Sequence, residues 1–187
     1  MTAMRRLATG VLALGLLVTT LSTVDGGVAS ASTPKGSGTI SCGAIGSMTF
    51  KPPLTNNSQQ TVKATVAFRE VNGCTGGTPT PDIAKVSGTA NLKDNSAVCA
   101  TMAVFNFPIT LRFRYHHLKT STFKGTVQGY GPQSPDTFLG IGSGAVSGSY
   151  PSTDAGFNWT FSYGGGEVGN CGSGLDSVTF QGEVSNI

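Results

Sequence analysis

Residues 40–50 read ISCGAIGSMTF and alternate between two kinds of side chain. The even positions hold Ile, Cys, Ala, Gly, Met and Phe, whereas the odd positions between them are mostly polar. Side chains alternate between the two faces of a β-strand but recur about every 3.6 residues along a helix. The stretch therefore predicts a strand with one apolar face and one polar face. Residues 62–68, 84–92 and 178–184 show the same period of two.

Turn residues divide the remaining chain into segments of similar length. Pro52-Pro53, Asn72-Gly73 and a predicted tight hairpin at Asp94-Asn95 each interrupt an alternating stretch. Half-apolar strands with short connections are typical of antiparallel sheets. We therefore expect an all-β fold, an antiparallel β-sandwich or barrel-like sandwich of about nine strands. Their expected bounds are 38–50, 61–72, 83–92, 97–105, 108–116, 121–130, 141–149, 157–163 and 176–185.

Glycines interrupt several of these expected strands. Glycine in the middle of a strand favours a bulge or a close approach of two backbones where a sheet coils. This pattern favours a barrel-like arrangement. The glycines concerned are Gly88, Gly125, Gly129, Gly144 and Gly148.

The N-terminal segment has the three-part layout of a secretory signal peptide. Arg5 and Arg6 precede an apolar run at 7–18, and Ala29-Ser30-Ala31 ends the segment with small side chains. The run is shorter than the roughly 20 apolar residues of a membrane-spanning helix. We expect cleavage of residues 1–31, leaving a secreted or envelope-associated chain without a transmembrane segment. A flexible leader at 32–38 and a single all-β domain at 39–187 would follow.

All four cysteines, Cys42, Cys74, Cys99 and Cys171, lie after the expected cleavage site. An even number in an oxidising compartment predicts two disulfides. The cysteines lack the closely paired spacing of zinc sites, so we expect no metal. Three connectivities are open for four cysteines. We favour Cys42 with Cys74 and Cys99 with Cys171, because the first pair flanks a strand-loop-strand unit.

The composition excludes several classes of protein. Charged residues make up 11% of the chain, and the formal net charge is +3. A nucleic-acid binder usually shows a concentrated basic footprint, so we expect no nucleic-acid partner. Neither a calcium-binding loop nor a G-x-S-x-G nucleophile motif occurs, and we expect no cofactor.

One group of motifs is similar to a pattern in small secreted proteins of actinobacteria. Cys42 is followed by MTFKPPL at 48–54 and by Gly-Cys-Thr at 73–75. In that pattern, a strand with a cysteine runs into a Thr-Phe-x-Pro-Pro-Leu turn, and a second strand ends at Gly-Cys-Thr. The resemblance spans most of the exported chain. It implies export and an all-β fold, and it implies no activity, ligand or catalytic residue.

Phe157, Trp159, Phe161 and Tyr163 place four aromatic rings on one face of an expected strand. Rings of this size usually belong to a core, because they bury a large area. Alternatively, Trp159 or Tyr163 at the outer end forms a stacking platform for a sugar or an apolar ligand. That alternative requires an indole face open to solvent.

Arg112, Arg114 and His116 form a ridge on one face of the expected strand 108–116. Lys119 and Lys124 make this region the densest positive patch of the chain. The ridge is either a solvated outer face that discourages edge-to-edge pairing of sheets or a contact for anionic envelope material. Phosphate and carboxylate groups match the fork of an arginine side chain.

Two other functions stay open. A secreted hydrolase would need His116 or His117 to meet a serine and an acid, although adjacent side chains of a strand point to opposite faces. A pore-like barrel in the envelope would need an apolar outer belt. We favour a non-enzymatic binding or structural module, whose partner is an envelope glycan or an anionic surface polymer.

Overall fold

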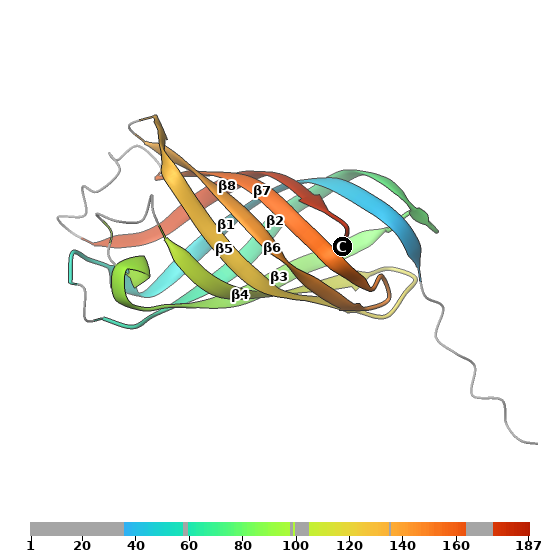
Figure 1. The fold of residues 1–187 in the computed structure, drawn as a ribbon, viewed down its shortest axis with the longest axis horizontal. Coiled ribbons are helices and arrows are strands. Elements are labelled where there is room, and N and C mark those ends of the chain that lie inside the picture. Colours follow the sequence, from blue (N-terminus) through green and yellow to red (C-terminus); the bar gives the residue numbers. More distant parts are fainter. Residues whose placement is uncertain (1–35, 58–59, 98, 100–104, 135, 164–173) are drawn as a thin grey trace, which may run out of the picture. The chain divides into compact units, whose positions relative to one another are not determined.

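The computed structural model describes residues 36–57, 60–97, 99, 105–134, 136–163 and 174–187. The expected signal peptide at 1–31 and residues 32–35 of the expected leader lie outside this part of the chain. Eight strands close into one barrel (Figure 1). They are β1 (Ser37–Leu54), β2 (Val62–Thr78), β3 (Ile83–Leu92), β4 (Asn106–Tyr115), β5 (Ser121–Ser134), β6 (Thr137–Gly148), β7 (Ser152–Ser162) and β8 (Leu175–Ser185).

Each strand pairs antiparallel with its neighbours in the sequence, and β8 pairs with β1 to close the ring. In this closing pair, Cys42 lies opposite Val184. The expected all-β antiparallel fold is confirmed, and it takes the form of a barrel rather than two packed sheets. Closure leaves no strand edge unpaired, because every strand has a partner on both sides.

The strand expected at 97–105 is wrong where the structure describes that segment. Asp94–Ala97 form a 3-10 helix, η1, and Cys99 is helical as well. Asp94 has a φ of 51°, in the left-handed region that aspartate tolerates better than most residues. The chain therefore leaves β3 through a helical turn instead of the tight hairpin expected at Asp94-Asn95.

The leader expected at 32–38 is also too long. Strand β1 already begins at Ser37, which pairs with Thr78 of β2. Gly36 is buried, and its backbone N–H donates a hydrogen bond to the Ser149 carbonyl oxygen over 2.7 Å. The sequence does not predict this first part of β1, because its small polar residues show no apolar alternation. The segment is a strand because it pairs with the last residues of β2.

The inward faces of the strands carry nearly all of the large apolar side chains, as the period of two predicts. Outward positions between them are mostly polar and exposed. A barrel of eight strands is just wide enough for side chains to fill its interior. On β4, for example, the buried inward side chains are Phe107, Ile109, Leu111, Phe113 and Tyr115.

Glycines on the inward faces make room for these rings. Gly142 of β6 pairs with Phe157 of β7, and a side chain at this glycine would collide with the phenyl ring. A side chain at Gly129 would likewise collide with the ring of Phe105. The close approaches expected at mid-strand glycines are thus present, because a narrow barrel holds large rings only where a neighbour has no side chain.

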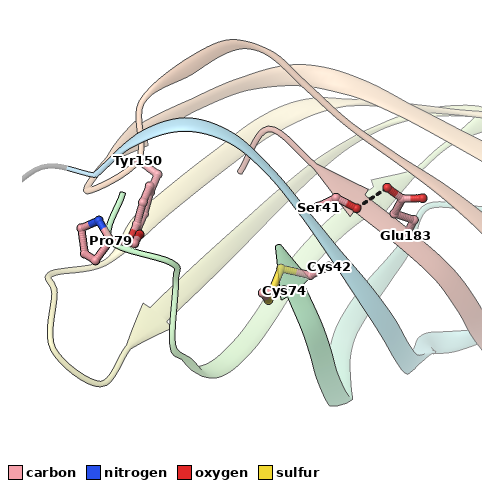
Figure 2. Close-up of a disulfide and its surroundings, with 6 residues drawn as sticks. All are labelled: Ser41, Cys42, Cys74, Pro79, Tyr150 and Glu183. Atoms are coloured by element: carbon pink, nitrogen blue, oxygen red, sulfur yellow. Dashed lines mark hydrogen bonds between the residues drawn. A yellow bond between two sulfur atoms is a disulfide. The ribbon is translucent and has the colours of Figure 1, made fainter. Parts of the chain in front are cut away.

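A disulfide between Cys42 and Cys74 links β1 to β2 (Figure 2). The two Cα atoms are 4.1 Å apart, and the favoured pairing of these two cysteines is confirmed. No cysteine in the described ranges is free, and Cys99 is fully buried. Its expected partner Cys171 lies outside the described residues, so the second pairing stays a prediction.

Two tyrosines pack together near one end of the barrel. The rings of Tyr115 and Tyr150 have centroids 5.2 Å apart. The Tyr150 hydroxyl donates a hydrogen bond to the Pro79 carbonyl oxygen over 2.5 Å, and Figure 2 shows both residues. The hydroxyl of the fully buried Ser121 accepts a hydrogen bond from the Tyr150 backbone N–H at 3.1 Å.

Burial of Tyr115 predicts a loss of stability at alkaline pH. Burial raises the pKa of Tyr115 to about 12, and the nearby Ser121 hydroxyl opposes this shift only in part. Between pH 10 and pH 12 the unfolded chain releases this proton and the folded chain does not, so the free energy of unfolding falls as pH rises. The contribution of Tyr115 is fully present below about pH 10, and its loss amounts to about 2 to 3 kcal/mol.

Urea denaturation between pH 9 and pH 12 measures this effect. We expect a smaller alkaline loss in Tyr115→Phe than in the wild type, because one titrating group has been removed. Tyr130→Phe is the matched control, since that side chain is 47% exposed. Equal alkaline losses in the wild type and Tyr115→Phe would contradict the burial of this hydroxyl.

Candidate functional site

The aromatic face of β7 points into the barrel. Trp159 is 0% exposed and Tyr163, directly after the strand, is 7% exposed. The indole therefore has no face open to solvent, and the surface stacking platform considered for Trp159 and Tyr163 is wrong. The physical reason is the size of the rings, because burying them inside the barrel removes a large apolar area from water.

Trp159 is the centre of an aromatic stack within the barrel. Its ring lies nearly parallel to those of Phe157 and Phe180, with centroid distances of 3.7 Å and 4.4 Å. Phe68 of β2 meets the indole edge-on at 5.4 Å. The indole Nε1 is buried and has no hydrogen-bond partner among the described residues. These contacts assign Trp159 to the core.

The cationic ridge, in contrast, lies on the outside. Arg112 and Arg114 are exposed on the outward face of β4, and His116 is exposed just beyond the end of that strand. Neighbouring strands extend the ridge. We call the outward cations of three adjacent strands the basic wall: Lys85 of β3, Arg112 and Arg114 of β4, and Lys124 of β5.

The basic wall is not an arrangement that favours stability. Lys85 lies directly opposite Arg114, and like charges in that position repel each other. No aspartate or glutamate occurs within β3, β4 or β5. A solvated outer face without a ligand more often carries positively and negatively charged side chains side by side. The positive charge of the basic wall is therefore not compensated by acidic residues of its own three strands.

The opposite side of the barrel is acidic. No lysine or arginine occurs after Lys124 in the whole chain. Strands β7 and β8 instead carry Asp154, Asp176 and Glu183. Because the strands follow one another around the ring in sequence order, cations and carboxylates that are separated along the chain lie on different sides of the barrel. The absence of cations after Lys124 is a sequence signal that could have revealed the basic wall.

His116 and His117 come together at one carboxylate, although adjacent strand residues would point to opposite faces. Strand β4 ends at Tyr115, and the chain bends at 116–118. The Nε2 atoms of both histidines are 3.9 Å from the Asp82 carboxylate, each from a different oxygen. The strand expected at 108–116 thus ends one residue earlier than predicted, and both histidines lie in the bend that follows it.

This histidine pair has no arrangement suited to nucleophilic catalysis. A distance of 3.9 Å to Asp82 is an ion-pair distance and too long for a hydrogen bond. Within the described ranges, no serine hydroxyl makes a hydrogen bond to either imidazole, whereas a catalytic base must hold its nucleophile. The same ranges hold no group of three or more side chains with the geometry of a metal site.

A second surface feature, which the sequence did not reveal, is a polar groove on the outer face. It has a volume of about 530 Å³ and extends over strands β1, β2, β6, β7 and β8. We call it the hydroxyl groove. Its polar side chains come from five strands: Ser47, Arg69, Thr137, Thr160, Ser162, Thr179 and Gln181.

Strand register arranges the hydroxyl groups of the groove in a row. Thr137 of β6 lies opposite Ser162 of β7, Ser162 opposite Thr179 of β8, and Thr179 opposite Ser47 of β1. Adjacent strands are about 4.8 Å apart, so the four residues follow one another at this spacing across β6, β7, β8 and β1. Four separate stretches of sequence build this row, and nothing within any one of them indicates it.

Comparison of the chain with protein-family models, curated proteins and solved structures finds no match. In the ranges that the structure describes, no helix is long and apolar enough to cross a membrane. The basic wall and the hydroxyl groove are the two surfaces of the described residues that bear on function.

Proposed function

We propose that this protein is a secreted, non-enzymatic binding module that holds an anionic polymer of the cell envelope against its basic wall. The observation that carries the proposal is the outward row of Lys85, Arg112, Arg114 and Lys124 on strands without a single acidic residue. The signal-peptide layout of residues 1–31 and the disulfide between Cys42 and Cys74 support an extracellular location.

The chemistry of the wall favours phosphate or carboxylate groups carried on a chain. Arginine guanidinium groups bind these oxyanions in a bidentate manner, and Arg112 and Arg114 project from the same face of one strand. Positions two apart on a strand are separated by about 7 Å. A polymer with repeated anionic groups can therefore contact several cations at once, and the acidic β7 and β8 turn it toward this wall.

The structure offers less support for the two alternatives. A lipid-facing barrel carries its apolar side chains outward and its polar ones inward. Here the large apolar side chains point inward, and among the described residues the exposed large apolar ones are Tyr130 and Ile141. A hydrolase with a histidine base would need a nucleophile beside His116 or His117, and neither imidazole is hydrogen-bonded to a serine in the described ranges.

Charge reversal tests the basic wall. We expect the double variant Arg112→Glu/Arg114→Glu to bind inorganic polyphosphate and poly-L-glutamate about 100-fold more weakly than the wild type at low salt. Each cation near an anionic surface contributes about 1 kcal/mol, so removing two of them weakens binding about 30-fold, and repulsion by the two introduced carboxylates accounts for the rest. Isothermal titration calorimetry at several salt concentrations measures both the affinity and its salt dependence.

The control is Lys51→Glu/Lys63→Glu, which changes the net charge by the same amount. Lys51 and Lys63 lie opposite each other on β1 and β2, away from Arg112 and Arg114. We expect this control to retain most of the affinity. Equal losses of affinity in both double variants would show that net charge alone attracts the polyanion, and this would refute a dedicated binding wall. An absence of polyanion binding by the wild type would refute it as well.

A further inference from the structure

We propose that the hydroxyl groove is a second binding site, for a neutral saccharide, on the side of the barrel that faces away from the basic wall. Strand β8 lies at the centre of the groove and is four strands from β4 in either direction around the ring. The two surfaces can therefore bind at the same time. This inference does not depend on the function proposed for the basic wall.

The first support for the site is the way the fold presents Arg69. Ile45 of β1 pairs with Glu70, but the next residue of β1, Gly46, pairs with Phe68. Arg69 is therefore the extra residue of a β-bulge, a device that changes the direction of a side chain and often lies near functional sites. Arg69 lines the groove and has no hydrogen bond or ion pair within the described part of the chain.

The second support is an array of polar groups without protein partners. The side chains of Thr160, Ser162, Thr179 and Gln181 make no hydrogen bonds to other described residues. Hydroxyl and amide groups both donate and accept, which matches the hydroxyl groups of a sugar. Small-molecule sites commonly have volumes of roughly 300 to 1,000 Å³, and the groove, at about 530 Å³, is within this range.

The third support is an apolar extension in register with the groove. Thr160 of β7 lies opposite Leu139 of β6, and Leu139 lies opposite Tyr130 of β5. These three positions all face outward, and the Tyr130 side chain is 47% exposed. Two strand spacings place Tyr130 about 10 Å from Thr160, so one bound chain can contact hydroxyl groups and an aromatic ring together.

Charge near the groove favours a neutral ligand over an anionic one. Glu70 lies opposite Ile45, and Glu183 lies two residues beyond Gln181 on the same strand. Ser41 donates a hydrogen bond to Glu183, which Figure 2 shows, and Asn72 donates one to Glu70. Two carboxylates on strands that line the groove, against a single guanidinium within it, repel a polyanion, whereas sugar hydroxyls are compatible with both signs.

Affinity electrophoresis with soluble neutral polysaccharides tests the site. The panel is dextran, mannan, galactan, arabinan and xylan, each cast into a native gel. We expect at least one of them to retard the wild type, and the retardation to persist at 0.5 M salt in a parallel calorimetric titration. Retardation by none of the five would overturn the proposal.

Shape-conserving variants locate the binding. We expect Thr160→Val/Thr179→Val and Arg69→Leu each to weaken polysaccharide affinity at least tenfold, because they remove hydrogen-bonding groups from the groove. Thr89→Val, an exposed hydroxyl on β3, is the matched control and should leave affinity unchanged. Circular dichroism confirms that each variant is folded.

The basic-wall variant separates this proposal from the proposed function. We expect Arg112→Glu/Arg114→Glu to retain neutral polysaccharide binding even if polyanion binding is lost. Loss of neutral polysaccharide binding in this variant, or full binding by Thr160→Val/Thr179→Val, would place the saccharide elsewhere and refute the groove as its site.

Discussion

Replacing Trp159 by alanine is expected to reduce the free energy of unfolding by about 3 to 5 kcal/mol. The indole is 0% exposed and is stacked between Phe157 and Phe180. Its removal leaves a cavity that these rings cannot fill, because both are held by strands of a closed barrel. A loss of this size is a large part of the stability of an ordinary domain, so we expect the variant to unfold at a clearly lower urea concentration.

Urea denaturation followed by far-UV circular dichroism is the suitable measurement, because Trp159 is the only tryptophan of the chain. Asn158→Ala is the matched control: the neighbouring side chain is exposed, and its loss should cost less than about 0.5 kcal/mol. Trp159→Phe should cost less than Trp159→Ala, because a phenyl ring fills part of the space that the indole leaves. A loss below about 1 kcal/mol for Trp159→Ala would contradict the central position of the indole.

Removing the disulfide between Cys42 and Cys74 is expected to reduce stability by about 3 to 4 kcal/mol. The two cysteines are 32 positions apart, and the bond restricts the unfolded chain over the whole β1–β2 unit. The double variant Cys42→Ala/Cys74→Ala removes the bond without leaving a free thiol at either position. Chemical denaturation of the variant and the wild type measures the difference.

Mass spectrometry of both proteins under non-reducing conditions is the control for the disulfide experiment. It shows whether the remaining cysteines pair as Cys99 with Cys171 in both proteins, so that only one bond differs between them. Unchanged stability in the double variant would mean that the unfolded chain is already restricted in this region, contrary to the entropic account.

The local features of the fold follow from sequence patterns that short segments contain. The alternation at 40–50 predicts a strand because the period of two depends only on neighbouring residues. The burial of Phe157 and Phe161 also follows, since four rings on one face of a strand can hardly remain in water. Arg112 and Arg114 are exposed for the complementary reason, namely the cost of burying an unpaired charge.

The errors arise where a distant partner outweighs the local pattern. Residues 37 and 38 resemble a flexible leader, yet Ser37 pairs with Thr78 of the neighbouring strand β2. The sequence allows Trp159 to stack on a sugar, because it cannot show which strands cover the indole. His116 and His117 share Asp82 only because β4 ends at Tyr115, and strand ends are set by pairing with neighbouring strands.

Local sequence is sufficient to predict most of the strands, the side of each strand that avoids water, and the lack of cations in the last third of the chain. These properties depend on the order of residues over a few positions or on simple composition. No single segment of the sequence shows that β8 closes onto β1, that a bulge presents Arg69, or that four hydroxyls form one row. The physical reason is that hydrogen-bond register between strands far apart in sequence is a property of the whole ring.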